Sequence, residues 1–186
     1  MSSKLAVVYT PLVTVYKNNT VESECISQLL FGELYEIIEE KNDWCHIKNL
    51  SDEVIGWIQS FLIYKIDENE FERIKNSYTI VNDAIVELVT PESNNSIKIL
   101  PGSSLPIIEG GIRHIDLGEK KYMAKTRISE PLSGNIRSKI KSKATIFLNS
   151  PYVHGGRSLF GIDAASFVQL LYKINGDRLP RFLENQ

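Results

Sequence analysis

Residues Pro151 to Gln169 read Pro-Tyr-Val-His-Gly-Gly-Arg-Ser-Leu-Phe-Gly-Ile-Asp-Ala-Ala-Ser-Phe-Val-Gln. The pair Gly155-Gly156 and the later Gly161 allow tight turns and close approaches of the backbone. Asp163 then precedes an apolar run, where its side chain can cap the first turn of a helix. A glycine-rich turn that leads into a helix start is a pattern typical of a functional site.

The stretch resembles the nucleophile motif of the NlpC/P60 family of cell-wall cysteine peptidases, which reads roughly P-Y-x-W-G-G-x-x-x-x-G-I-D-C-S-G-F-x-Q. Nine positions match in register: Pro151, Tyr152, Gly155, Gly156, Gly161, Ile162, Asp163, Phe167 and Gln169. Later matches to the family's usual continuation are Tyr172, Gly176 and Leu179-Pro180-Arg181. The departures from the motif are His154 for Trp, Ala164 for the nucleophilic Cys, Ala165 for Ser and Ser166 for Gly.

The resemblance implies a cysteine peptidase mechanism, in which a thiolate at the helix start attacks an amide and a histidine on a later strand acts as base. Members of the family commonly cut between D-glutamate and a diamino acid of peptidoglycan. Ala164 has no nucleophilic atom, and the region that carries the histidine in the family does not occur in these 186 residues. We therefore expect no intact catalytic residue. A serine hydrolase built from Ser166 and His154 is disfavoured, because Ser166 lies on another helix face.

Recognition of a ligand could survive the loss of the nucleophile. By resemblance, Asp163 binds the free amine of an L-Ala-γ-D-Glu peptide, Tyr152 lines the pocket, and His154 and Ser166 are further candidates. Structural alternatives exist for each residue. Asp163 as an N-cap contributes about 1 kcal/mol of stability, Tyr152 can be a core aromatic, Ser166 a small packing residue and His154 a residue of the pocket rim.

The first 66 residues contain short apolar or alternating runs separated by polar turns, which predicts a small all-β barrel. They resemble a bacterial SH3-like (SH3b) domain in Leu29 to Glu33, in the strand from Asp43 to Ile47 and in Gly56-Trp57-Ile58. Trp44, Tyr64 and Trp57 are candidates for a peptide-binding wall there. The alternative for the two tryptophans is a place in the barrel core.

A repeat at a shift of 70 residues predicts a second SH3-like unit. Thr20-Val-Glu22-Ser23 recurs as Thr90-Pro-Glu92-Ser93, and the pattern from Leu29 to Glu39 recurs from Ile99 to Glu109. We expect an SH3b-like domain at 1–66, a linker or short helix at 67–77, a second SH3b-like domain at 78–130 and a partial NlpC/P60-like domain at 131–186. In the second copy, His114 stands opposite Trp44.

The expected fold class is α+β: two small barrels followed by a truncated, largely helical N-terminal part of a papain-like domain. Apolar residues at helical spacing predict an amphipathic helix over 135–148 and a second helix over 164–175, with Gly176 as its C′ residue. Both helices are expected to pack in a core. A papain-like sheet cannot form before the end at Gln186, so the helices need the SH3-like units, a second copy or a partner protein as a packing surface.

Composition excludes several classes of partner. With 21 basic and 23 acidic residues, a formal charge of -2 and a pI near 6.0, the chain has no electrostatic footprint for nucleic acid or anionic membrane. No segment predicts a membrane span or a signal peptide, so we expect a cytoplasmic protein, or a secreted or periplasmic one if a signal was removed. The three histidines are far apart, so we expect no metal and no cofactor. Cys25 and Cys45 could form a disulfide only in an oxidising compartment, and in the cytoplasm they are expected to be reduced thiols.

Three functions of different class fit these features. The first, which we favour, is a catalytically inactive NlpC/P60-like protein that binds a peptidoglycan stem peptide, a muropeptide or a protein partner. The second is an authentic γ-D-glutamyl-diamino acid endopeptidase represented by an inactivated and shortened form. The third is an adaptor in which the SH3b pair does the work, and its sign would be an aromatic groove on a barrel.

Overall fold

The computed structural model describes residues 4–93, 95–106, 114–126, 128–129, 133–182 and 184. The strands are β1 (Leu5–Val7), β2 (Leu12–Tyr16), β3 (Cys25–Leu30), β4 (Leu34–Lys41), β5 (Trp44–Asn49), β6 (Ile55–Gln59), β7 (Tyr78–Ile80), β8 (Val86–Val89), β9 (Ser96–Ile99), β10 (Ser104–Pro106), β11 (His114–Leu117), β12 (Lys120–Ala124), β13 (Arg157–Ser158) and β14 (Gly161–Ile162). The helices are α1 (Glu68–Asn76), α2 (Ile136–Ala144) and α3 (Ala164–Ile174). This mixture agrees with the expected α+β class. None of the described helices is long and apolar enough to cross a membrane.

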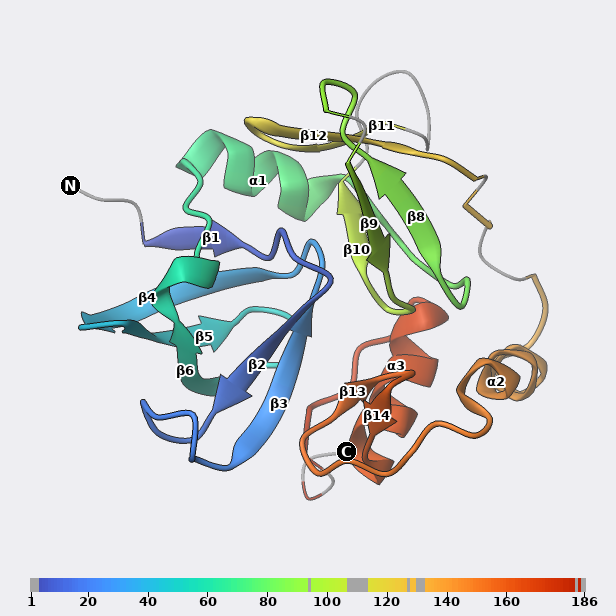
Figure 1. Ribbon diagram of the computed structural model, residues 1–186. Helices are drawn as coiled ribbons and strands as arrows, with labels where there is room; N and C mark the ends of the chain where they lie inside the picture. Colours follow the sequence, from blue (N-terminus) through green and yellow to red (C-terminus); the bar gives the residue numbers. More distant parts are fainter. Residues whose placement is uncertain are drawn as a thin grey trace.

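Strands β1 to β6 form what we call the first unit, a six-stranded antiparallel sheet in the order β1-β4-β5-β6-β2-β3 (Figure 1). Successive side chains of a strand point to opposite faces. In β5 this places Cys45 and Ile47 in the interior, both fully buried, while their neighbours lie on the outer face. The core of the unit is thus built from alternate residues of short strands. Cys25 and Cys45 are both free thiols.

Helix α1 follows the first unit, where the sequence predicted a linker or short helix. The Asp67 side chain accepts a hydrogen bond from the Glu70 backbone N–H and so caps the helix start. Phe71 and Ile74, three residues apart, form its buried face. Figure 1 shows α1 lying between the first unit and the strands that follow.

Strands β7 to β12, which we call the second unit, form a four-stranded sheet β11-β12-β8-β9 and a pair β10-β7. Its core is continuous with part of the first unit, because Val7 and Phe31 pack in the same cluster as Leu88, Leu105 and Ile115. A second SH3-like domain at 78–130 remains a prediction.

Two glycines support the predicted repeat. Gly32 and Gly102, 70 positions apart, have φ values of 76° and 85°, a region that favours glycine. The Gly32 N–H donates to the Val8 carbonyl, and the Gly102 N–H donates to the Val81 carbonyl, each at 2.8 Å. The equivalent turns therefore tie back to the chain in the same way. Ile107, Ile108 and Glu109, which also carry the repeat, lie outside the described residues.

The C-terminal unit, from residue 133 onward, contains α2, the small β13–β14 ladder and α3. Helix α3 begins where the sequence predicted and ends one residue earlier, at Ile174, with Asn175 at the C-cap and Gly176 at a φ of 95°. Its buried side chains Leu170 and Leu171 pack with Leu30 of the first unit and Leu100 of the second. The apolar face of α3 therefore rests on both preceding units.

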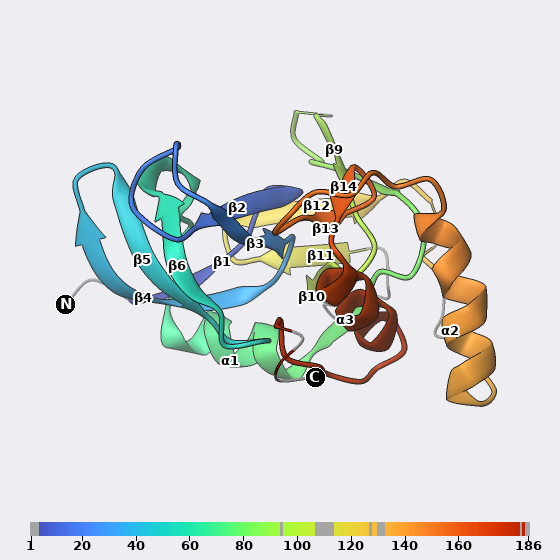
Figure 2. The ribbon, with the colours of Figure 1, turned by 90° about the horizontal axis from the view of Figure 1, so that it is seen from below.

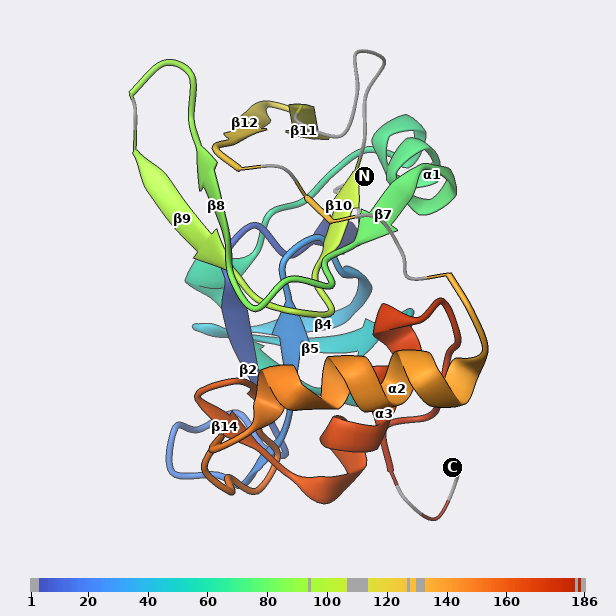
Figure 3. The ribbon, with the colours of Figure 1, turned by 90° about the vertical axis from the view of Figure 1, so that its right-hand side faces the viewer.

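Helix α2 departs from the expectation of a core-packing helix. None of its residues is buried, and Ile136 is 41% exposed. Figures 2 and 3 show α2 at the outside of the molecule, beside α3. From α2 itself, Ile140 and Ala144 pack partly against the C-terminal core, while Phe147, in the 3-10 turn that follows within the predicted range 135–148, is buried in that core. The reason is geometric: α2 lies beside α3 at the outside of the molecule, and it makes a polar contact with the second unit, in which Lys143 donates to the Asn82 carbonyl and side-chain oxygen.

Candidate functional site

Asp163 lies at the start of α3, where its carboxylate accepts four hydrogen bonds. Oδ1 accepts from the Ser166 backbone N–H at 2.8 Å, which is the predicted N-cap contact, and Oδ2 accepts from the Gly155 N–H at 3.1 Å. Arg181 donates to both oxygens, at 3.3 Å and 2.6 Å. Burial alone would raise the pKa of Asp163, but the Arg181 and Ser166 hydrogen bonds outweigh it and hold that pKa below its usual range.

Gly155 is required for this turn. Its φ is 73°, and an added Cβ would overlap the Cys25 carbonyl oxygen of strand β3. The turn before α3 therefore lies directly against the first unit. Arg181 strengthens the same contact, because its Nε donates to the Ser27 hydroxyl at 3.1 Å.

A cavity of about 400 Å³ opens beside Asp163, between the start of α3 and the first unit. Its lining residues are Glu24, Ile26, Tyr152, His154, Asp163, Ala164, Ala165, Arg181, Phe182 and Glu184. Ala164 is exposed, at the position of the cysteine in the NlpC/P60 motif. The position is accessible, but its methyl group can neither attack a carbonyl nor exchange a proton.

The lining of this Asp163 cavity is acidic. Glu24, Asp163 and Glu184 bring three carboxylates, and Arg181 brings one fixed positive charge. His154 Nε2 lies 2.9 Å from Glu24 Oε1, and Lys17 Nζ lies 3.2 Å from Glu24 Oε2. The hydrogen bond to His154, and then that to Lys17, lowers the pKa of Glu24. Glu24 is therefore ionised at neutral pH, and its side chain is 45% exposed.

The structure brings together three of the site residues predicted from the motif. Tyr152, 73% exposed, and His154 line the cavity with Asp163. Ser166 does not line it. Its side chain is fully buried and its hydroxyl has no hydrogen-bond partner in the described structure, so Ser166 fills the interior, as the packing alternative predicted.

The predicted aromatic residues of the first unit lie elsewhere. Tyr64 packs against Tyr9, with ring centroids 5.7 Å apart, and its hydroxyl accepts a hydrogen bond from the Glu119 N–H. It thus belongs to the contact between the first and second units. Trp44 stacks edge to face on Tyr16. None of these aromatic side chains lines the Asp163 cavity.

The alternative that the tryptophans belong to the barrel core is wrong. Trp44 and Trp57 are half-buried and point to the outer face of the sheet, because the inward positions of β5 and β6 alternate with theirs. Trp57 stacks on His46 at a centroid distance of 4.6 Å. With Tyr16, these residues form an outer aromatic cluster on strands β2, β5 and β6.

A buried ionic network, which sequence reasoning missed, joins the C-terminal unit to the first unit. Arg157 is 1% exposed and donates from its two terminal nitrogens to both oxygens of Glu33, each at 2.9 Å. Lys173 Nζ lies 2.5 Å from Glu33 Oε1. Burial alone would raise the pKa of Glu33, but the charges of Arg157 and Lys173 outweigh it and lower that pKa to about 2.

Further members complete this network. Arg157 Nε donates to Gln169 Oε1 at 2.8 Å, and Gln169 Nε2 in turn donates to Asp52 Oδ2 at 3.1 Å. Gln169 was matched only as a motif position. Arg157 occupies a variable position of the motif, so no local signal pointed to it. Among the residues that the structure describes, no group of three or more metal-ligating side chains comes together.

Comparison with known proteins supports the resemblance on which the sequence analysis relied. A family model for the bacterial dipeptidyl-peptidase SH3 domain matches residues 15–60. A gamma-D-glutamyl-L-lysine dipeptidyl-peptidase from Bacillus cereus is 23% identical over 175 residues, which cover 83% of this chain and 52% of that protein. Dipeptidyl-peptidase 6 from Lysinibacillus sphaericus is 21% identical over 189 residues, which cover 92% and 69% of the two chains. This chain thus spans about half the length of the Bacillus cereus relative.

Two solved structures share the fold. An NlpC/P60 family protein from Bacillus cereus has a TM-score of 0.81 at 16% identity, over 98% of this chain and 76% of that one. An NlpC/P60 endopeptidase from Photobacterium damselae subsp. piscicida has a TM-score of 0.68 at 16% identity, over 99% of this chain and 45% of that one. The chain therefore shares its fold with NlpC/P60 proteins, and its residues 15–60 match a bacterial SH3 domain.

Proposed function

We propose that this chain binds a short peptide with a free amino terminus, of the L-Ala-γ-D-Glu-diamino acid type found in peptidoglycan, and does not cleave it. The observation that carries the proposal is the acid-lined cavity beside Asp163, in which Ala164 occupies the nucleophile position. Such a cavity keeps the walls and charge that attract an ammonium group, while the group that would attack the peptide is absent.

Glu24 is the carboxylate best placed to meet the ammonium group. Asp163 already accepts four hydrogen bonds, which is about the full capacity of a carboxylate. Glu24 is more exposed, and its two partners, Lys17 and His154, are surface side chains that can move aside. In this proposal Asp163 holds the turn and adds negative charge, while the exposed ring of Tyr152 forms a side wall.

The curated relative from Bacillus cereus supports the ligand class, because its name specifies a γ-D-glutamyl-L-lysine substrate. The Asp163 cavity uses residues of both the first unit and the C-terminal unit. The match to this relative covers 83% of the chain. Recognition of the same class of peptide is therefore the simplest function for the cavity.

Calorimetric titration of L-Ala-γ-D-Glu-diaminopimelate tests this function. We expect saturable binding, and N-acetylation of the peptide should weaken it roughly tenfold or more, since a charged hydrogen bond contributes about 1.5–3 kcal/mol. Glu24→Gln should have a similar effect. Glu22→Gln is the matched control, because Glu22 is an exposed carboxylate of the same hairpin outside the cavity. Equal affinity for the acetylated peptide would refute ammonium recognition, and chromatographic detection of cleaved peptide would refute the loss of catalysis.

The outer aromatic cluster favours an SH3b adaptor as a second candidate. Tyr16, Trp44 and Trp57 lie together on an open sheet face, and aromatic side chains are frequent anchors of binding surfaces. If this face binds peptidoglycan independently of the Asp163 cavity, Trp44→Ala should abolish co-sedimentation with isolated peptidoglycan. The same change should leave calorimetric binding of the stem peptide unchanged. Unchanged co-sedimentation would exclude this candidate.

A further inference from the structure

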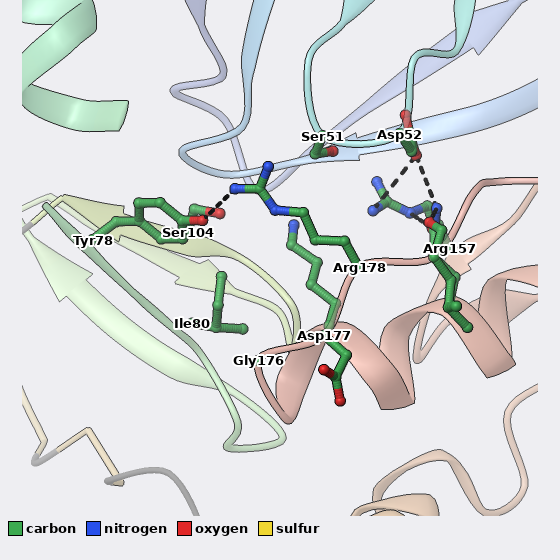
Figure 4. A pocket seen from close by; sticks show the side chains of 12 residues that line it. Ser51, Asp52, Tyr78, Ile80, Ser104, Arg157, Gly176, Asp177 and Arg178 are labelled. Carbon is green, nitrogen blue, oxygen red and sulfur yellow. Dashed lines mark hydrogen bonds and ion pairs between the residues drawn. The ribbon is translucent and has the colours of Figure 1, made fainter. Parts of the chain in front are cut away.

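A second cavity lies at the opposite end of α3 from Asp163, where the three units meet. It has a volume of about 270 Å³ and is shown in Figure 4. Its lining residues are Ser51, Asp52, Tyr78, Ile80, Ser104, Arg157, Gln169, Lys173, Gly176, Asp177, Arg178 and Leu179. We call it the junction cavity. It shares no lining residue with the Asp163 cavity.

Two of its charged residues are already satisfied by the protein. Arg157 donates to Glu33, Gln169 and the Gln28 carbonyl, and these hydrogen bonds involve all three nitrogens of its guanidinium. Asp52 accepts hydrogen bonds from Asn49 and Val54 at one oxygen and from Gln169 at the other. Arg157 Nη2 also lies 3.9 Å from Asp52 Oδ2, so the charge of Asp52 is compensated within the network and its oxygens already have donors.

Lys173 differs from these two residues. Its ammonium forms one ion pair, with Glu33, among the described residues, although an ammonium can donate three hydrogen bonds. The side chain is 12% exposed and lines the junction cavity. Burial, and the nearby charge of Arg157, lower the pKa of Lys173 in spite of Glu33. Its charged form is thus incompletely solvated, and an acceptor in the cavity would stabilise it.

A second cation lines the same cavity. Arg178 is exposed, and one of its terminal nitrogens donates to the Tyr78 hydroxyl at 2.8 Å. Figure 4 shows the Arg178 guanidinium next to Tyr78 and Ser104, while the carboxylate of Asp177 points away from them. Asp177 is exposed and can face solvent. Arg157, Lys173, Glu33 and Asp52 together carry two positive and two negative charges. Arg178 forms no ion pair among the described residues, so it adds one positive charge at the cavity.

We propose that the junction cavity binds the carboxylate of a small organic acid between the ammonium of Lys173 and the guanidinium of Arg178. The Ser104 hydroxyl supplies a further donor from the second unit, and Ser51 of the first unit, whose hydroxyl donates to Glu33, lines the cavity beside it. Because the carboxylate contacts all three units, its binding stabilises their arrangement by mass action. This site is independent of peptide binding beside Asp163, and the two can be tested separately.

Titration with succinate, with neutral succinamide as the control probe at constant ionic strength, tests the proposal. We expect calorimetry to detect saturable binding of succinate and none of succinamide. Arg178→Gln should weaken succinate binding roughly tenfold, because a charged hydrogen bond contributes about 1.5–3 kcal/mol. Arg137→Gln is the matched control, since Arg137 is an exposed arginine of α2 outside the cavity.

Lys173 can be followed directly by nitrogen-15 NMR of its side-chain amine. Saturation with succinate should raise the pKa of Lys173, because an anion favours the charged form. The proposal is wrong if succinamide binds as tightly as succinate, if Arg178→Gln binds like the unmodified chain, or if succinate leaves the Lys173 signal unchanged. Thermal denaturation of both variants without ligand controls for loss of the fold, which Arg178 is too exposed to govern.

Discussion

The first unit makes two large contacts that differ in kind. Its contact with the second unit is an apolar core, in which Val7 and Phe31 pack beside Leu88 and Ile115. Its contact with the C-terminal unit combines apolar packing around Leu30 with a buried ion pair, in which the charge of Arg157 is buried together with that of Glu33. An apolar contact tolerates changes that keep its volume, whereas a buried ion pair depends on both partners. We therefore expect the second contact to be the more sensitive to single substitutions.

One turn of the first unit makes both contacts. Phe31 enters the apolar core, and Glu33 enters the ionic network two residues later. Gly32 between them has a φ of 76°, and an added Cβ would overlap the Ser104 carbonyl oxygen of the second unit. Glu33 also accepts a hydrogen bond from the Leu30 N–H, which closes the turn. The turn therefore couples the two contacts, because both depend on its backbone conformation.

The largest effect is expected for Arg157→Met, which keeps most of the side-chain volume and removes the charge. It should lower the free energy of unfolding by about 3–5 kcal/mol, because it leaves the buried carboxylate of Glu33 with one cation less. Guanidinium denaturation measures this change. Combining it with Glu33→Gln should cost less than the sum of the two single changes. Strict additivity would contradict the ionic description of the contact.

The ionic contact should also make stability depend on pH. The pKa of Glu33 falls from 4.5 to about 2 on folding. A lowered pKa stabilises the folded state above the unfolded pKa, and this stabilisation is lost as the pH falls from about 4.5 through 2, by about 3 kcal/mol in total. Urea denaturation between neutral and acidic pH measures the loss. Glu33→Gln should flatten the profile in this window, and an identical acid profile in the variant would contradict the assignment.

Ile115→Val probes the apolar contact. Ile115 is 1% exposed, and loss of one buried methylene should cost about 1 kcal/mol. The change in unfolding free energy should be the same at neutral pH and at pH 4, because no titrating group is involved. Parallel denaturation curves at the two pH values measure this. A loss of unfolding free energy larger than that of Arg157→Met would contradict the expectation that the ionic contact is the more sensitive of the two.

Local features of the sequence predicted the elements that depend on neighbouring residues. Asp163 before an apolar run predicted the start of α3, and Gly176 predicted its end, because caps act within one helical turn. The pattern of strands in the first 66 residues predicted the first sheet for the same reason. The exposed position of α2 was not predictable, since amphipathic spacing does not reveal how much of a face finds a partner.

Features that join distant parts of the chain escaped prediction. Arg157 and Glu33 are 124 positions apart, and each is an ordinary charged residue in its local context. Arg181 was identified only as part of the Leu-Pro-Arg match, although it contacts Asp163 and Ser27. The outward orientation of Trp44 depends on strand register, which a shift of one residue would reverse. Each of these features is set by contacts between residues that are far apart in the sequence.

The smallest effect tests whether the contact between the first and second units is apolar throughout. Lys120 of the second unit lies over the rings of Tyr9 and Tyr64 of the first, at 4.8 Å and 5.1 Å from their centroids. Lys120→Met keeps the stem and removes the charge, and should cost about 0.5–1 kcal/mol if the cation–π contacts are effective. A double-mutant cycle with Tyr64→Leu isolates this energy from packing. A coupling energy near zero between Lys120 and Tyr64 would mean that burial of apolar surface, not the cation–π contact, stabilises this contact. The contact between the first and second units would then differ more clearly from the ionic contact at Arg157.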